Sequence, residues 1–531
     1  MIKEPELQYE ERIILFSDEK KRFESNFNRL SIVRAGVFIL SVILLVYLAN
    51  DRNFTWVWII ALCFPLIFGA IVKYHNKIRY KRNHAQILSD INKEEILKIN
   101  GNLKIFETGD RFHDDLHPYA KDLDIFGHNS LYQLLNRCNT LGGKSLLANW
   151  LKGPSNNETI ISRQESIKEL YPQLEWRQEF EARGRHFKDE KENINALLTL
   201  IESEDLLPKL KFLKLAILVL PFLSLITIVL WIFYNFHYLF PLSIIIVNAI
   251  VLKMVNSFAN DASEKTYKGN TALKSYSKLI EMIEKTNFKS QKLIDLKHFF
   301  HHQKFKASSE IKKLQIILDF LQVRNNVFYQ LINVILILDV YWLLKGELWK
   351  KKSGQYVKKW FASIDEIEAL NSLAGFKYSN PDFCFPKLVK ETHYFSSKSL
   401  GHPLIKKNIR VYNDFEMMGK GKVIIITGSN MAGKSTFLRT VAINVVLALI
   451  GAPVCASSLV LSNIYVFTSM RTEDNLEESV SSFYAELKRL KQLLNLLEEG
   501  SPVLFMLDEI LKGTNSMDRH LGAIALIKQL N

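Results

Sequence analysis

One segment near the C-terminal end constrains the fold of this chain more than any other part of the sequence. It begins with Val423–Ile426, a β-branched run that is typical of a buried parallel strand. The next residues are Gly428-Ser429-Asn430-Met431-Ala432-Gly433-Lys434-Ser435, which fit the pattern G-x-x-x-x-G-K-[ST] at every position, and then Thr436. Apolar residues from Phe437 to Leu449 predict a helix. Strand, loop and helix therefore occur in the order that a phosphate-binding P-loop requires.

The chemistry of this loop predicts a nucleotide site. Its two glycines let the backbone curl until successive N–H groups point at phosphate oxygens, and the N-terminus of the following helix adds a partial positive charge. Lys434 would reach the β- and γ-phosphates, and Ser435 would ligate Mg²⁺. We therefore expect residues 428–436 to bind ATP, with Mg²⁺ as the accompanying metal.

A second apolar run supplies the other half of such a site. Val503–Leu507 predicts a buried strand and ends in Asp508-Glu509, about 70 residues beyond the loop. Asp508 would hold the Mg²⁺, directly or through water, and Glu509 would orient and polarise the attacking water. The sequence thus predicts an ATPase with Lys434 and Glu509 as catalytic residues and with Ser435 and Asp508 as metal ligands.

Four apolar stretches form two close pairs: Ala35–Ala49 with Phe54–Val72, and Leu215–Phe233 with Leu239–Leu252. A membrane-spanning helix needs roughly 17–25 mostly apolar residues, and most of these stretches lie near that range. Neither member of the first pair shows a polar stripe of helical period, which disfavours the alternative of buried core helices. We expect two transmembrane hairpins, in residues 31–73 and 214–253, and hence about four membrane-embedded helices.

The charges around the two hairpins predict their orientation. Lys and Arg flank both pairs, whereas the tight loop at 234–238 has neither and the loop at 50–53 has one. By the positive-inside rule both loops face out and the large soluble parts face the cytoplasm, so we expect a multi-pass protein of the cytoplasmic membrane. A fifth apolar run, Val327–Leu344, contains Asp339. Because an ionisable residue near a bilayer centre costs at least about 2.5 kcal/mol, we interpret this run as a buried helix of a soluble domain.

Composition narrows the choice of partner only in part. The net charge of +14 fits nucleic acid and fits an anionic membrane surface equally well. The four cysteines are far apart and form no CxxC pair, which argues against a metal knuckle or a disulfide framework and favours a reducing compartment. Residues 84–210 and 255–380 are predicted to be mostly helical, and their many lysines favour a solvated helix face over the alternative of a nucleic-acid patch.

Two blocks of sequence resemble the MutS family of DNA mismatch-repair proteins. The first comprises the loop at 427–436 together with Asp474–Leu487 and Ile510–Asp518, and it resembles the ATPase domain of that family. The second resembles the start of the helical core, or lever, domain of the family, and it comprises Leu123–Gly127, Ser130–Arg137, Gly142–Leu151 and Ile161–Gln164. The resemblance implies a homodimeric, ATP-driven clamp with an ABC-type α/β ATPase domain and with DNA as its partner. It also implies that Ser481 of one subunit contacts the γ-phosphate held by the other.

The chain departs from the family pattern at several points. It has no Phe-x-Glu segment, so the resemblance does not extend to mismatch recognition. Leu511 and Lys512 replace the usual Gly and Arg. The sequence stops at Asn531, before the next strand and the Thr-His switch of the family, so we expect a truncated ATPase domain and leave the activity of the 531-residue form open.

The expected layout has six parts: a cytoplasmic segment at 1–30, a hairpin at 31–73, the first part of the helical core at 84–210, a second hairpin at 214–253, the second part of the core at 255–390, and an incomplete ATPase domain at 391–531. The leading interpretation is a membrane-anchored MutS-like ATPase acting on DNA. The alternative is a membrane-tethered mechanical ATPase that grips a protein or the membrane without DNA. Half of an ABC transporter is disfavoured, because Ser481 follows Ser435 by only 46 residues (481 − 435).

Overall fold

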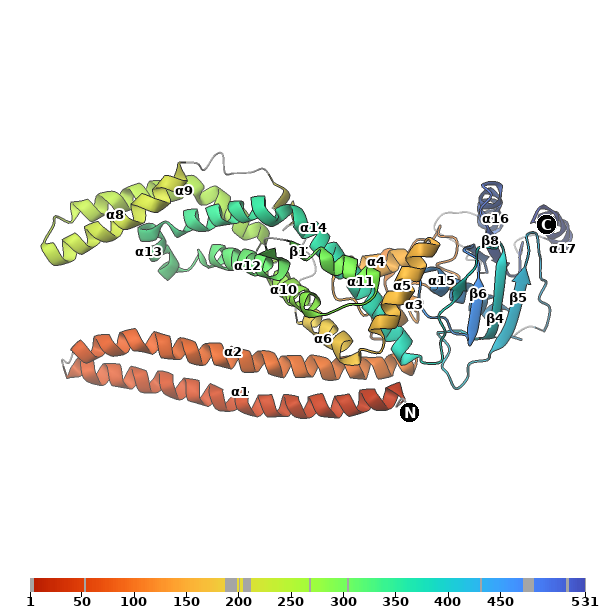
Figure 1. Cartoon of the computed structure of the whole chain (residues 1–531), viewed down its shortest axis with the longest axis horizontal. Helices are drawn as coiled ribbons and strands as arrows, with labels where there is room; N and C mark the ends of the chain where they lie inside the picture. Colours follow the sequence, from red (N-terminus) through yellow and green to blue (C-terminus); the bar gives the residue numbers. More distant parts are fainter. Residues whose placement is uncertain are drawn as a thin grey trace. The chain divides into compact units, whose positions relative to one another are not determined.

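The computed structural model describes residues 4–51, 54–186, 198–199, 201–203, 212–266, 269–302, 305–429, 432–470, 482–511 and 515–530. This part of the chain is mostly helical, with a small set of strands toward the C-terminus (Figure 1). Its contacts divide the chain into two compact units. One unit comprises residues 1–136, 148–182 and 373–531, and the other comprises 137–147 and 183–372. Each unit is described by itself.

The first unit begins with a long antiparallel hairpin, α1 (Pro5–Asn50) and α2 (Phe54–Ile99), whose helices run side by side (Figure 1). At 46 residues each, the two helices are about 69 Å long. The predicted span Ala35–Ala49 is the last part of α1, and Phe54–Val72 is the first part of α2. The side chains of residues 54, 58, 61 and 62 lie outside the described part.

The two ends of the hairpin differ in chemistry. Toward the loop, the side chains of α1 are apolar and exposed, Leu40 by 66%. At the other end, Tyr9 is fully buried and its hydroxyl hydrogen-bonds the Ser379 hydroxyl at 3.0 Å. Ser379 in turn donates to the Glu95 carboxylate at 2.9 Å. A buried polar network of this kind fixes the base of the hairpin, because each of its members would be costly to leave without a partner.

Four short helices continue the first unit or link it to the second: α3 (Leu131–Leu135), α4 (Leu141–Leu151), α5 (Asn157–Leu170) and α6 (Leu174–Arg185). Sequence signals explain where two of them begin. Ser130 and Gln133 form a reciprocal capping box at the start of α3. The Asn156 side chain accepts a hydrogen bond from the Thr159 amide at 2.8 Å and so caps α5.

The C-terminal part of the first unit contains two small sheets. The first has the order β3 (Lys387–Leu388), β6 (Ser458–Leu461), β4 (Tyr394–Leu400), β5 (Asn413–Met418), and it is mixed, because β3 and β6 are parallel whereas β4 is antiparallel to both of its neighbours. The second pairs β7 (Tyr465–Ser469) with β8 (Val503–Leu507) in parallel. The C-terminal part also contains three helices, α15 (Lys434–Leu449), α16 (Ser482–Glu498) and α17 (Ser516–Leu530).

Two of the expected elements before and after the P-loop are confirmed, and one is not. The helix over Phe437–Leu449 is α15, and the strand over Val503–Leu507 is β8. By contrast, Val423–Ile426 forms no strand, and Ile425 is 72% exposed. A β-branched run favours an extended backbone, but a strand also needs a hydrogen-bonded neighbour, and no segment of the described chain pairs with this run.

The second unit contains another apolar hairpin, α8 (Leu213–Tyr234) and α9 (Leu239–Thr266), which lie side by side (Figure 1). Large apolar side chains on α8 are strongly exposed, Leu215 by 68% and Phe233 by 75%. By length and composition, α1, α8 and residues Leu239–Glu264 of α9 could each cross a membrane. Helices α10 (Gly269–Lys285), α11 (Gln291–His298) and α12 (Ala307–Val323), with the short strand pair β1 (His301–His302) and β2 (Phe305–Lys306), follow the hairpin.

The expectation of one buried helix over Val327–Leu344 is wrong. The run forms two helices, α13 (Val327–Leu336) and α14 (Leu338–Ser379), which meet at an angle of 81°. The break follows from one of the polar residues within the run: the Asn333 side chain accepts a hydrogen bond from the Asp339 amide at 2.9 Å and so caps the second helix. The outer side of α13 is exposed rather than buried, with Phe328 at 76%.

Candidate functional site

The P-loop leads directly into the N-terminus of α15. Gly433 precedes the helix with φ of 85°, a left-handed conformation that favours glycine. It offers no side-chain cap, so the first-turn amides of Lys434, Ser435 and Thr436 have no partner within the helix. Amides at a helix N-terminus form an anion site when a phosphate supplies the missing acceptors. The described part of the loop therefore has the backbone chemistry of a phosphate cradle.

The two predicted metal ligands lie together although 73 positions separate them. The Ser435 hydroxyl, in the first turn of α15, donates a hydrogen bond to the Asp508 carboxylate at the end of β8. A hydroxyl and a carboxylate are oxygen ligands of the kind that Mg²⁺ prefers, and P-loop proteins use this pair for that purpose. These residues fit an Mg²⁺ ion that takes its remaining ligands from water and nucleotide.

Lys434 lies over the loop that it is expected to serve. Its ammonium group donates to the carbonyl oxygens of Gly428 and Ser429, both at 2.8 Å. These contacts hold the cation beside the amides of the loop, where it adds to their attraction for an anion.

The turn after β8 presents Glu509. The Asp508 amide donates to the Ser469 carbonyl at 3.0 Å, which continues the β7–β8 pairing to the carboxylate. Glu509 and Leu511 then have φ of 50° and 58°, so the chain turns sharply and leaves Glu509 exposed. Such conformations in residues other than glycine persist where the surrounding structure holds them in place.

Glu486 holds this turn, and it is not among the predicted site residues. It lies in α16, is 5% exposed, and accepts a hydrogen bond from the Leu511 amide. The resemblance contained a signal for it, because Glu486 is the last acidic residue of the Asp474–Leu487 segment. A buried carboxylate from another helix thus determines the backbone course directly after Glu509.

Three predicted site residues lie outside the described residues. These are Asn430 and Met431 of the P-loop and Ser481. Of the remaining predicted residues, Gly428 and Ser429 lie before this gap, and Ala432, Gly433, Lys434, Ser435 and Thr436 lead into the start of α15, with Asp508 beside Ser435. The catalytic role of Ser481 stays a prediction.

A buried carboxylate of the helical core holds the strand that precedes Ser481. Asp122 is 3% exposed and accepts hydrogen bonds from the Thr468 hydroxyl at 2.7 Å and the Met470 amide at 3.2 Å. Arg489, in α16, pairs with the same carboxylate at 3.5 Å and donates to the Pro118 carbonyl at 3.0 Å. Since Thr468 belongs to β7, this cluster fastens the end of that strand to residues 117–122.

The helix that carries the P-loop is held at two points by the helical core. Near its start, Arg439 pairs with Asp124 at 3.3 Å. Just beyond its end, Arg163 of α5 donates to the Ile450 carbonyl at 3.2 Å, where a cation also complements the helix dipole. Burial, together with the nearby Arg439, lowers the pKa of His402 to about 4, so this histidine is neutral at physiological pH.

Comparison with known proteins agrees with this arrangement. Residues 424–531 match MutS domain V, and residues 101–344 match MutS domain III. The DNA mismatch repair protein MSH3 of Candida glabrata is 33% identical over 181 residues, which are 32% of this chain and 17% of that protein. The DNA mismatch repair protein MutS of Ehrlichia ruminantium is 34% identical over 175 residues, which are 32% of this chain and 21% of that protein. The DNA mismatch repair protein MutS of Shouchella clausii is 32% identical over 187 residues, which are 34% of this chain and 21% of that protein. The chain therefore spans about a fifth of the length of the curated relatives it matches.

Proposed function

Because residues 101–344 match MutS domain III and residues 424–531 match MutS domain V, we propose that the chain is an Mg²⁺-dependent ATPase that is anchored in a membrane and works as a dimeric clamp on DNA. The observation that carries the proposal is the hydrogen bond between Ser435 and Asp508 beside the free amides of α15. It joins the two halves of the P-loop signature in one place, next to Lys434.

Each residue of the site has one task in this proposal. The amides of residues 428–436 bind the phosphates, and Lys434 binds the β- and γ-phosphate oxygens. Ser435 and Asp508 would hold Mg²⁺, which when bound neutralises charge on the phosphates. Glu509, exposed at the turn after β8, orients the attacking water and accepts its proton.

Membrane anchoring is supported by the exposed apolar helices. The sides of α1, α8 and α9 carry contiguous large apolar residues, and a patch of this size on a protein in water is unfavourable. We take the apolar start of α2 as a further span, which would give two hairpins and four spans. The loop between α8 and α9 contains no Lys or Arg, which by the positive-inside rule supports a location outside the cytoplasm.

The relatives are DNA mismatch repair proteins, and a net charge of +14 on this chain suits a polyanion such as DNA. One observation favours the second candidate, a membrane-tethered mechanical ATPase without DNA. The hairpin α8–α9 lies inside the stretch that matches MutS domain III, so the helical core itself contains the apolar insertion.

The contact between Ser435 and Asp508 can be tested by measuring ATP turnover of the full chain in detergent as a function of Mg²⁺ concentration. Ser435→Ala and Asp508→Asn should each lower turnover by at least about tenfold and raise the Mg²⁺ concentration needed for half-maximal rate. Asp382→Asn is the matched control, since Asp382 is an exposed carboxylate paired with Lys407. Wild-type Mg²⁺ dependence in both site variants would remove the assignment of this site.

Binding to duplex DNA separates the two candidates. A clamp that grips DNA should lose affinity steeply as salt rises, because Lys and Arg that neutralise phosphates release counterions. Preserved ATP turnover with no duplex binding at low salt would support the mechanical ATPase without DNA.

A further inference from the structure

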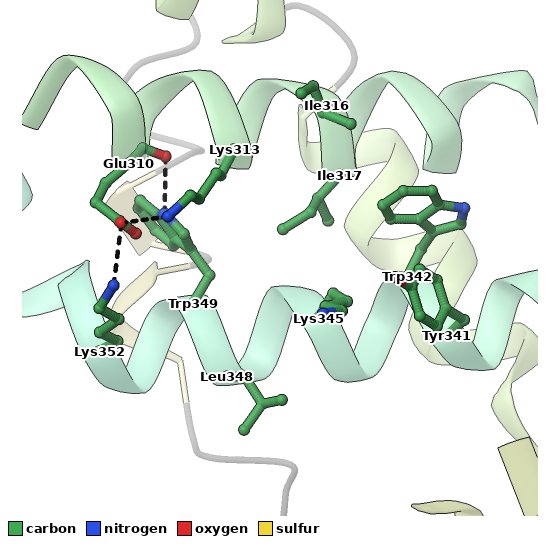
Figure 2. Close-up of a pocket in the computed structure, with 10 residues that line it drawn as sticks. All are labelled: Glu310, Lys313, Ile316, Ile317, Tyr341, Trp342, Lys345, Leu348, Trp349 and Lys352. Atoms are coloured by element: carbon green, nitrogen blue, oxygen red, sulfur yellow. Dashed lines mark hydrogen bonds and ion pairs between the residues drawn. The ribbon is translucent and has the colours of Figure 1, made fainter. Parts of the chain in front are cut away.

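A groove between α12 and α14 of the second unit combines cations with an apolar wall. The cavity is about 340 Å³ and is lined by Lys313, Lys345, Lys352, Tyr341, Trp342 and Leu348, among others. Figure 2 shows the two helices facing each other, with Glu310 and Lys313 on α12 and the aromatic residues on α14. We call this cavity the lysine groove.

The charge inside the lysine groove is unbalanced toward positive. Lys313 and Lys352 reach from opposite helices to the Glu310 carboxylate, at 2.8 and 3.0 Å (Figure 2). Burial alone would raise the pKa of Glu310, but the hydrogen bonds from these two ammonium groups outweigh it and lower the pKa, so Glu310 is ionised. The groove therefore contains one negative charge and three positive charges.

Lys345 is the cation that this carboxylate does not neutralise. Its ammonium group lies 5.5 Å from the centroid of the Tyr341 ring, and among the described residues no carboxylate is within ion-pair distance of it. An exposed ammonium beside an aromatic ring and without an anion is available to one from outside.

The other end of the lysine groove is apolar and aromatic. Trp342 stacks on Phe320, with ring centroids 4.1 Å apart, and its indole nitrogen is buried without an acceptor in the described part of the chain. Ile316 and Leu348 are each 48% exposed. A surface that joins lysines to tryptophan, tyrosine and aliphatic side chains suits a ligand with an anionic head and an apolar body.

The lysine groove begins where the apolar part of α9 ends. Lys253 is the first charged residue of that helix. One turn later, Asn256 accepts a hydrogen bond at 2.7 Å from Arg324, which also pairs at 3.0 Å with Asp339 of α14. Tyr341 lies two residues beyond Asp339 on the same helix. This polar layer marks the expected membrane surface, and the groove starts directly on its cytoplasmic side.

We propose that the lysine groove binds the phosphate headgroup of an anionic phospholipid from the surrounding bilayer, with Lys345 as its main cationic contact. Tyr341 and Trp342 lie at the depth where aromatic residues meet headgroups, and their rings contact the upper part of the lipid chains. Duplex DNA would use the lysines but would leave the apolar wall without a partner. The inference rests on the membrane part of the proposed function.

Quenching of tryptophan fluorescence tests the proposal on the full chain in dodecyl maltoside micelles. Phosphatidylglycerol or phosphatidylcholine with brominated acyl chains is added at rising mole fraction. Brominated phosphatidylglycerol should quench at lower mole fraction, and Trp342→Phe should remove this difference. Lys345→Glu should weaken the apparent affinity for phosphatidylglycerol by at least about fivefold. This factor corresponds to the attraction between one lysine and an anionic membrane surface. Lys351→Glu is the matched control, because Lys351 is exposed on the same helix but does not line the groove.

Three results would overturn the proposal. Equal quenching by both lipids would show that the protein does not select an anionic headgroup. Equal effects of Lys345→Glu and Lys351→Glu would show that the net charge of the protein, and not the lysine groove, determines the lipid preference. If added inorganic phosphate or duplex DNA removed the difference in quenching between the two lipids, the groove would be assigned to that ligand instead. Release of the protein from membranes by alkaline carbonate would refute the anchoring itself, whereas an embedded protein without lipid preference would refute the lysine groove alone.

Discussion

Asp122→Asn is the substitution that most sharply tests the link between the helical core and the nucleotide site. Asp122 is buried, and its carboxylate accepts hydrogen bonds from the Thr468 hydroxyl and the Met470 amide and pairs with Arg489. Asparagine keeps the shape and one acceptor oxygen but removes the charge. Since a hydrogen bond to a charged group contributes about 1.5–3 kcal/mol, we expect a loss of stability of that size. Asp122→Ala leaves the guanidinium, the hydroxyl and the amide without this acceptor, and should cost about 3–5 kcal/mol.

The functional consequence follows from the position of the cluster. Thr468 lies near the end of β7 and Met470 directly follows that strand, on the way toward Ser481, whereas the first-turn amides after the P-loop belong to α15. Asp122→Asn should therefore lower ATP turnover while equilibrium affinity for ATP stays close to wild type. A variant that is merely less stable would not separate these two quantities below its melting temperature.

Melting temperature, ATP affinity and turnover of the full chain in detergent provide the assay. Asp18→Asn is the control, because Asp18 forms an exposed pair with Lys21 at 3.5 Å and such pairs contribute little. Wild-type turnover and melting temperature in Asp122→Asn would refute the reasoning that this carboxylate positions the end of β7.

Three further predictions concern pH, topology and the shared site. Burial raises the pKa of Glu368 to about 7, so the folded chain keeps a proton that the unfolded chain releases at lower pH. The stability of the fold is therefore greatest below the ordinary glutamate pKa and falls as pH rises toward 7. Glu368→Gln should flatten this part of the profile of melting temperature against pH. A cysteine at His237, between α8 and α9, should react with an impermeant maleimide from outside intact cells, and labelling only after lysis would refute the topology. Mixing a Ser481→Arg chain with a Lys434→Ala chain should retain about one working site per heterodimer if the site is shared across a dimer, and an inactive mixture would show that each chain uses its own Ser481.

Local sequence patterns predicted the elements whose signals are continuous in the chain. The glycines and the lysine of residues 428–434 predict the P-loop, and the apolar runs predict α8, α9, α15 and β8. Val423–Ile426 shows the limit of such signals, because a strand depends on a partner that lies elsewhere in the sequence. The run at 327–344 shows another limit: its apolar composition predicts one buried helix, whereas the cap formed by Asn333 accompanies a division into two helices, the first with an exposed apolar side.

Residues that join distant parts of the chain could not be predicted from the sequence. Asp122 meets Thr468 across 346 positions, and Glu486 meets Leu511 across 25. Nothing in the local sequence distinguishes Asp122 from an exposed aspartate, because its burial follows from the packing of residues 117–122 against β7 and α16. The pairing of Ser435 with Asp508 could be anticipated because both residues belong to a known pattern.

Equilibrium binding of ATP to the wild-type full chain and to Lys434→Ala, with Mg²⁺ present, tests the central claim most directly. The P-loop account predicts tight binding by the wild type and a loss of at least about 100-fold in affinity when the cation beside Gly428 and Ser429 is removed. Lys434→Arg keeps the charge and should retain part of the affinity. Equal ATP affinity in the wild type and in Lys434→Ala would contradict the assignment of residues 428–436 as the nucleotide site.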